Sequence, residues 1–313
     1  MNLQQLRYAS EVVRRGLNVS EAAAALHTSQ PGVSKQIRAF EQELGVDLFV
    51  RQGRRFTTLT DAGREILKGI ERILSEIAAL KAVGEEFADH AKGSLAVAVT
   101  HTQARYALPK VVTAFKNRFP DVRLTLHQGS PHQLAQLVID GKADVAIATE
   151  ALADYDELVS IPGYQWRHCV VVPARHALAK AKPLTLEAIA RYPIVTYDPS
   201  FTGRSSIDRV FALRGLKPEI ALSALDSDVI KSYVALGLGV GIISSMAMGR
   251  VREDGLVALD ATHLFPMQTT RLAFRRGAYL RGFTVEFIRL FSPHVEAKDL
   301  RDLVGAPGQH FEI

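Results

Sequence analysis

Three hydroxyl-rich turns are the parts of this sequence whose side chains could bind a small ligand. THTQ (100–103) follows the apolar run LAVAV, Thr149 follows DVAIA, and TGRSS (202–206) follows the apolar run at 194–197. Hydroxyl and amide groups donate hydrogen bonds without net charge, and a helix that begins in such a turn adds free N–H groups and a positive dipole end. The turns predict a site for a small anion, a carboxylate or an acylated amino acid. The alternative is that Thr102 and Thr202 merely cap their helices.

Alternating strands and helices are expected to position the first two turns. Apolar runs predict strands at 95–99, 122–128 and 144–149, separated by helices at 102–119 and 131–140. This β-α-β-α-β order predicts parallel strands with right-handed crossovers. Ligands of open α/β sheets bind beyond the carboxyl ends of the strands, which is where these turns lie.

A second set of strands and helices follows, and the chain then returns to the first. The second set comprises strands at 166–173, 194–197, 219–223 and 240–244 and helices at 184–190, 202–215 and 228–236. A strand at 269–274 is expected to rejoin the first set, followed by a helix at 282–290. We therefore expect two α/β lobes, joined by crossings near 161–165 and 264–268, with the turns facing each other across a cleft.

Other possible chemistry receives little support. The glycines of GxGxG at 237–241 follow a predicted helix, which favours a helix stop and tight turn over a dinucleotide site. His127 and His132 lack metal-ligand spacing, and His101 lies beside the presumed cleft without a nucleophile and an acid partner. GxSxG, HExxH and P-loop patterns are absent from the sequence. We expect no catalytic residue, metal or cofactor.

Composition is typical of a soluble protein. The single cysteine, Cys169, cannot form an internal disulfide and is expected to be buried in a strand, which fits a reducing compartment. The N-terminus lacks a hydrophobic signal core, and the weakly polar run at 234–249 is too short to span a bilayer comfortably. We expect a cytoplasmic protein that does not bind membranes. The net charge of +5 and the pI near 9.3 fit a polyanionic partner without requiring one.

Residues 18–44 predict two short helices joined by a tight polar turn, with a helix at 3–15 packed behind them. The second helix follows Ser29, a favourable N-cap, and ends near residue 44; its apolar face leaves a short basic face free. A major groove accepts such a helix, although an ordinary solvated hairpin is the alternative. We expect base-edge contacts from Thr28, Gln30, Pro31 and Ser34, phosphate contacts from Lys35 and Arg38, and Ser29 within the same surface.

A basic hairpin and a long helix follow. Strands at 47–51 and 54–58 predict a wing, whose Arg51, Arg54 and Arg55 would contact phosphates or a minor groove; a charged surface hairpin is the alternative. The helix at 60–91 carries a heptad row that predicts a dimer, the alternative being a helix lying on the next domain. That row consists of Ile66, Ile70, Ile73, Ile77 and Leu80.

Four segments together resemble the LysR-type bacterial transcriptional regulators, most closely the CysB/Cbl group. They are TSQPGVSKQIRAFEQELG (28–45), THTQARYALP (100–109), TGRSSID (202–208) and DSDVIKSYVALGLGVGI (226–242). THTQARYALP is the segment specific to the group, and the resemblance extends over about 1–304. It implies a winged helix-turn-helix at 1–59, a linker helix at 60–92 and an effector domain of periplasmic-binding-protein type at 93–304. Lobe I would hold 93–162 and 267–304, and lobe II would hold 163–266. Residues 305–313 lie outside the resemblance, and we expect them to form a flexible tail.

The resemblance also implies an effector site and a function. Residues matching the group's pocket are Thr100, Thr102, Gln103, Thr149 and Thr202. Implied effectors are acetylserines and sulfate-like anions, and implied partners are promoter DNA, RNA polymerase and further copies of the chain in a dimer or tetramer. We expect a regulator of sulfur assimilation and cysteine biosynthesis. The runner-up is a Cbl-like regulator of sulfonate or sulfate-ester use; a solute-binding receptor and an enzyme are less well supported.

Overall fold

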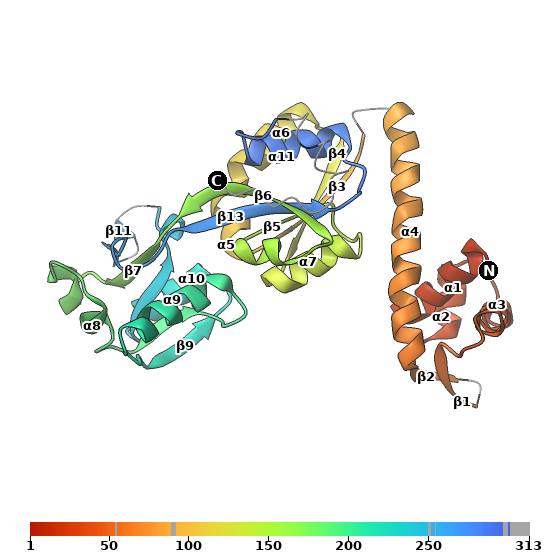
Figure 1. The fold of residues 1–313 in the computed structure, drawn as a ribbon, viewed down its shortest axis with the longest axis horizontal. Helices are drawn as coiled ribbons and strands as arrows, with labels where there is room; N and C mark the ends of the chain where they lie inside the picture. The colour runs from red at the N-terminus through yellow and green to blue at the C-terminus, as the bar shows by residue number, and fades with distance from the viewer. Residues whose placement is uncertain (54, 89–91, 250–251, 254, 297–299, 301–313) are drawn as a thin grey trace. The chain divides into compact units, whose positions relative to one another are not determined.

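The computed structural model describes residues 1–53, 55–88, 92–249, 252–253, 255–296 and 300. The chain forms two compact units, Met1–Gly84 and Glu85–Ile313 (Figure 1). Arg54 and the expected tail at 305–313 lie outside the described residues. Among the helices of the described ranges, none is long and apolar enough to cross a membrane.

The first unit has the predicted order of three helices and a hairpin. Its elements are α1 (Leu3–Arg14), α2 (Val19–Ala25), α3 (Gln30–Leu44), β1 (Phe49–Gln52) and β2 (Arg55–Leu59). Val33, Ile37 and Phe40 of α3 are buried, and Ala22 and Ala23 of α2 belong to the same core. Small side chains on α2 let α3 pack closely against it.

Helix α4 (Asp61–Ala88) begins at Thr60, whose Oγ1 accepts a 2.8 Å hydrogen bond from the Gly63 nitrogen. The expected heptad row on this helix is divided between two environments. Ile70 is 2% exposed and packs in the core of the first unit, and Ile66 is packed against that core. Ile73 and Leu80 are 41% and 72% exposed. Ile77 is half-buried. The first two members of the row therefore stabilise their own unit, whereas Ile73 and Leu80 are exposed.

The first sheet of the second unit has the strand order β4-β3-β5-β13-β6. Its strands are β3 (Gly93–Val99), β4 (Val122–Gln128), β5 (Val145–Ala148), β6 (Leu158–Trp166) and β13 (Gln268–Arg275). β3 pairs with β4 and β5 in parallel, which confirms the predicted crossovers, and β13 joins antiparallel to β5 and β6. The crossing predicted near 161–165 is wrong, because these residues belong to β6 in the first sheet, where a register shift opposite Thr270 accommodates Pro162 and Gly163.

The second sheet has the order β11-β12-β7-β10-β8-β9. Its strands are β7 (His168–Pro173), β8 (Ile194–Tyr197), β9 (Ile220–Ala224), β10 (Val240–Ser244), β11 (Arg252–Glu253) and β12 (Leu256–Asp260). The single strand predicted at 166–173 is wrong at its start, because Trp166 ends β6 in the first sheet and His168 begins β7 in the second. The chain therefore crosses between sheets at Arg167. We call the parts built on the first and second sheets lobe I and lobe II.

Helices cover both lobes. They are α5 (His101–Tyr106), α6 (Leu108–Arg118), α7 (Pro131–Ile139), α8 (Leu186–Ile189), α9 (Thr202–Leu213), α10 (Ser227–Ala235) and α11 (Gly282–Phe291), with short 3₁₀ turns η1 (Glu150–Asp154), η2 (Ala177–Lys180) and η3 (Ser245–Ala247). The single helix predicted at 102–119 is wrong, since it is divided at Ala107. Pro109 lacks an N–H and its ring would clash with the carbonyl of Arg105 in a continuous helix. The break makes α5 a separate helix beside the cleft.

A candidate effector cleft and DNA-binding surface

A small cavity lies between the two lobes where several strands end. Its volume is about 30 Å³, roughly two to three times the space that one water needs. Its lining comes from both lobes and the crossing: Thr100, Thr102, Gln103, Thr149, Trp166, Tyr197, Phe201, Gly203, Leu225 and Ser244. These described lining residues include no acidic or basic side chain. The cavity therefore offers hydrogen-bonding groups without net charge, a setting that suits an anion held by neutral donors.

The predicted threonines enter this lining from the ends of β3 and β5. Thr100 is the N-cap residue of α5, yet its side chain makes no capping bond. Thr102 lies inside α5 and its Oγ1 is 3.4 Å from Ser227 Oγ, so the reading of Thr102 as a mere cap is wrong. Thr149 precedes η1 and also lacks a capping bond. Thr202 begins α9, and its side chain lies outside the described part of the chain.

Gln103 is fixed in place by lobe I. It is 2% exposed, its Nε2 donates to Thr270 Oγ1 at 3.0 Å, and its Oε1 accepts from the Tyr164 hydroxyl. Burial raises the pKa of Tyr164 to about 12, which keeps that hydroxyl protonated as a donor. Because β6 and β13 orient both ends of the amide, Gln103 forms a rigid wall of the cavity.

Lobe II and the crossing contribute residues that the sequence analysis missed. Trp166 ends β6 and Ser244 ends β10, so the strand-end rule that singled out the threonines also applies to them. Trp166 Nε1 and Ser244 Oγ are buried without a hydrogen-bond partner among the described residues. Such groups are uncommon in folded proteins and are usually explained by a ligand or an ordered water. They are therefore further candidate donors to a bound ligand.

Tyr197 belongs to the cavity lining, and His168 packs against Trp166 of that lining. The Tyr197 hydroxyl is 2.7 Å from Ser227 Oγ and accepts from the Ser244 nitrogen at 2.8 Å, and burial raises the pKa of Tyr197 to about 12. His168 is 1% exposed, and burial lowers its pKa to about 4, so its ring is neutral at neutral pH. A Cβ at Gly203 would lie 3.3 Å from His168 Nε2, which explains glycine at this close approach of α9.

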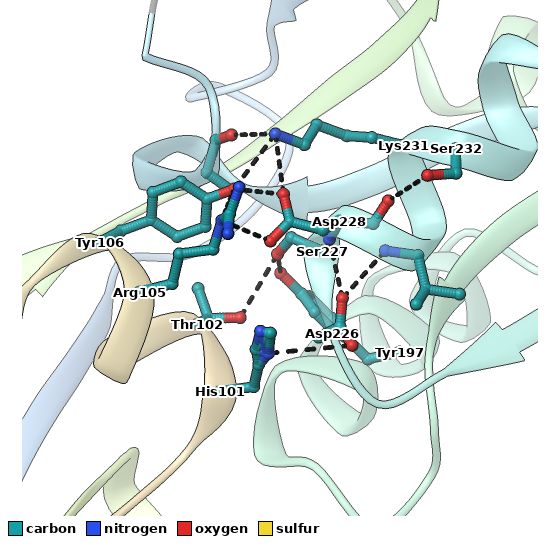
Figure 2. Close-up of polar contacts among 12 residues, drawn as sticks. His101, Thr102, Arg105, Tyr106, Tyr197, Asp226, Ser227, Asp228, Lys231 and Ser232 are labelled. Atoms are coloured by element: carbon teal, nitrogen blue, oxygen red, sulfur yellow. Dashed lines mark hydrogen bonds and ion pairs between the residues drawn. The ribbon is translucent and has the colours of Figure 1, made fainter.

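Four side chains link α5 of lobe I to α10 of lobe II (Figure 2). We call Arg105, Tyr106, Asp228 and Lys231 the interlobe cluster. Asp228 accepts from the Tyr106 hydroxyl at 2.6 Å and pairs with Arg105 Nε at 2.8 Å and Lys231 Nζ at 3.2 Å. Burial acts to raise the pKa of Asp228, but the hydrogen bonds from Tyr106 and Lys231 outweigh it and the pKa is lowered. The cluster holds the helix that carries Thr102 and Gln103 against lobe II.

The first unit presents the two-faced helix that the sequence predicts. Ser29 caps α3 by accepting from the Gly32 nitrogen at 3.2 Å, so its hydroxyl is already used within the helix. The proposed DNA contacts lie on the side away from the core. Ser29, Gln30, Pro31, Lys35 and Arg38 are exposed, and Thr28 and Ser34 are half-buried.

The wing arginines differ from one another in their surroundings. Arg55 is exposed, and Arg54 lies outside the described residues. Arg51 instead pairs with Glu41 of α3 and with Asp47, and its guanidinium carbon lies 5.2 Å from the centre of the Phe56 ring. The guanidinium of Arg51 is therefore engaged within its own unit. It would have to leave Glu41 and Asp47 to reach a phosphate.

Comparison with known proteins agrees with both units. The family model described as "LysR substrate binding domain" matches residues 88–295, and "Bacterial regulatory helix-turn-helix protein, lysR family" matches residues 3–64. The regulator CysB of Burkholderia cenocepacia is 50% identical over 313 residues, covering 100% of both chains. SsuR of the same organism is 51% identical over 304 residues, covering 97% of this chain and 99% of its own. Cbl of Escherichia coli is 44% identical, covering 96% and 95%.

Solved structures show the same architecture. The cofactor-binding domain of Cbl aligns with a TM-score of 0.66 and 46% identity, covering 68% of this chain and 93% of that one. Full-length CbnR in complex with its target DNA aligns with a TM-score of 0.67, covering 93% of this chain and 99% of its own; at 22% identity, it shows a shared fold. The relatives are transcriptional regulators and not enzymes. The chain therefore belongs to the LysR family of DNA-binding transcriptional regulators, in the group that includes CysB and Cbl.

Proposed function

We propose that this regulator controls genes of sulfur assimilation and cysteine biosynthesis in response to a small anionic effector bound between its lobes. The observation that carries the proposal is the interlobe cavity with neutral donors from Thr100, Thr102, Gln103 and Thr149. Neutral hydroxyl and amide groups can bind a compact anion without a counter-charge. The names of the relatives CysB and Cbl supply the link to sulfur metabolism.

Two effector classes are candidates for this cavity. Acetylserine would place its carboxylate among the donors, and sulfate or a related oxyanion would occupy the same position. The second class corresponds to a Cbl-like regulator of sulfonate or sulfate-ester use. The chain is 50% identical to CysB and 44% identical to Cbl, so both readings are kept. We take acetylserine, a sulfate-like anion, or both as effectors.

The proposed output is binding to double-stranded promoter DNA in the cytoplasm, in contact with RNA polymerase. Thr28, Gln30, Pro31 and Ser34 would approach base edges, and Lys35 and Arg38 would contact phosphates. The exposed part of the α4 row would pair two copies, with a tetramer as the full assembly. An effector can alter this output only if it binds one arrangement of the lobes better than another.

Calorimetry with the full chain tests the effector site. Acetylserine, sulfate and thiosulfate are titrated into the wild type and into Thr102→Ala. We expect binding of at least one ligand, weakened in the variant by about 1–3 kcal/mol if the hydroxyl donates to a charged group. Thr113→Ala is the matched control, since Thr113 is exposed and bonds only the nearby Pro109 oxygen. Unchanged affinity in Thr102→Ala would remove this residue from the site.

The DNA interface is tested separately by a salt titration. Arg38→Ala should weaken promoter binding and reduce the slope of log K against log salt by about 0.9, the value expected for one lost phosphate contact. Arg123→Ala, an exposed arginine in the second unit, is the control. An unaltered slope in Arg38→Ala would contradict the phosphate contact without bearing on the effector cavity.

A further inference from the structure

Lobe II has a second functional edge, at the end of its sheet that lies opposite the cleft. Strands β8 and β9 are parallel and begin side by side, since the Ile194 nitrogen donates to the Glu219 oxygen at 2.8 Å. The carboxyl end of β8 faces the cleft, because its last residue, Tyr197, belongs to the cavity lining. The amino ends of the two strands therefore lie at the other edge of the sheet, away from the effector site.

Three loops meet at these amino ends. Residues 174–183 follow β7, residues 190–193 lead into β8, and residues 214–219 lead into β9. The rings of His176 and Tyr192 are centred 4.6 Å apart, which holds the first loop against the second. The pairing of β8 with β9 places the third loop beside the second. We call these three loops the basic edge.

The basic edge concentrates positive charge on exposed side chains. Its permanent cations, all exposed, are Arg175, Lys180, Lys182, Arg191, Arg214 and Lys217. The carboxylates in or beside the loops are Glu219 and Glu187 of α8. Six cations against two carboxylates leave a net charge of +4, compared with +5 for the whole chain.

These cations are not neutralised within the molecule. Among the described residues, none of the six forms an ion pair, whereas Arg204 of the same lobe pairs with Asp208 at 2.8 Å. Like charges that gather on one surface without counter-charges repel one another, and they attract a polyanion from solution. The basic edge therefore has the charge and the exposure of a docking surface for a polyanion.

We propose that the basic edge contacts the phosphates of the DNA that the first unit holds. DNA is the polyanion that this chain binds as a member of its family, and tethering to the first unit gives it a high effective concentration at lobe II. Such contacts are independent of base sequence and add affinity by releasing counterions. The contact requires a DNA-bound first unit and is independent of the effector cavity.

A salt titration of promoter binding by the full chain tests this contact, using a promoter fragment with long flanks. One edge variant combines Arg175→Gln with Lys182→Gln in the first loop. The other combines Arg191→Gln with Lys217→Gln in the remaining two loops. Urea unfolding of each variant measures whether its stability matches that of the wild type.

The matched control combines Lys110→Gln with Arg123→Gln in lobe I. It also removes one exposed lysine and one exposed arginine, so that all three variants have the same net charge. A difference between the control and the edge variants therefore reports where the charge lies and not how much charge is removed.

We expect each edge variant to reduce the slope of log K against log salt by about 1.8 per bound copy, which is about 0.9 for each of two phosphate contacts. The control should keep the slope of the wild type. Unchanged slopes in both edge variants, or an equal reduction in the control, would overturn the proposal. An unchanged slope together with a loss of promoter activation would assign the basic edge to an acidic protein partner, and would likewise overturn the contact with DNA. Arg38→Ala reports on the first unit alone, so its outcome distinguishes a failure of that interface from a failure of this one.

Discussion

Arg51 of the wing is ion-paired to Glu41 of helix α3. The Glu41 side chain is 4% exposed, and its Oε1 also accepts from the nitrogens of Leu48 and Phe49 at 2.8 and 3.3 Å. One buried carboxylate therefore joins α3 to the start of the wing and to its basic side chain. This arrangement assigns Arg51 a part in holding the wing in position.

Replacing Arg51 by methionine should destabilise the first unit and leave its electrostatic contact with DNA nearly unchanged. Removal of one partner from a buried ion pair costs about 3–5 kcal/mol, and we expect about 2–3 kcal/mol because Arg51 is 25% exposed. Urea unfolding measures the loss. A salt titration of promoter binding should keep its slope, since no phosphate contact is removed.

Arg55→Met is the matched variant, because Arg55 is an exposed wing arginine. It should leave stability unchanged and reduce the salt slope by about 0.9. The reverse pattern, in which Arg51→Met lowers the slope and leaves the unfolding curve unaltered, would show that Arg51 leaves Glu41 to contact DNA.

Asp228→Asn should loosen the contact between α5 and α10. The substitution removes the charge that Arg105 and Lys231 share, so amide hydrogens of α5 should exchange faster than in the wild type. Since α5 carries Thr102 and Gln103, sulfate affinity should fall by about three- to tenfold, as for loss of a partly buried pair of about 1 kcal/mol. Asp121→Asn, at an exposed site, is the control. Unchanged exchange in α5 would show that the cluster does not hold the lobes together.

The sequence was most informative where a strand is a buried apolar run between turn residues. Ile194–Tyr197 and Val240–Ser244 have the predicted boundaries for this reason. It was misleading where proline stands inside or near an element. Pro162 lies inside β6, which was not predicted and which accommodates the proline through a bulge. Pro109 divides a helix whose apolar pattern is continuous.

The candidate site divides in a similar way. The threonines could be found because strand ends and hydroxyl-rich turns are both visible in a sequence. Ser244 ends a predicted strand and was within reach of the same rule, whereas Trp166 could not be found, because it ends β6, a strand that the sequence did not predict.

Cys169 should be inert toward alkylating reagents in the folded protein. It is 6% exposed in β7, and burial raises the pKa of its thiol to about 12, so the reactive thiolate is scarce at pH 8. Iodoacetamide labelling followed by mass spectrometry should modify the chain in urea and not in buffer. Labelling of the native chain at the rate of a free thiol would mean that lobe II opens readily around β7.

His168 should make the second unit less stable in mild acid. Burial lowers its pKa from 6.5 to about 4, so the unfolded chain binds a proton more readily than the folded chain does. Its contribution is fully present above about pH 6.5 and is lost as pH falls toward 4, by up to about 3 kcal/mol.

His168→Phe fits the aromatic surroundings of Trp166 and Phe265 and cannot titrate. The difference in unfolding free energy between wild type and variant, measured in urea from pH 7.5 to 4.5, should therefore shift in favour of the variant as pH falls. His294→Phe, at an exposed site, is the control. Parallel pH profiles for wild type and His168→Phe would mean that the imidazole reaches solvent or a partner when it is protonated.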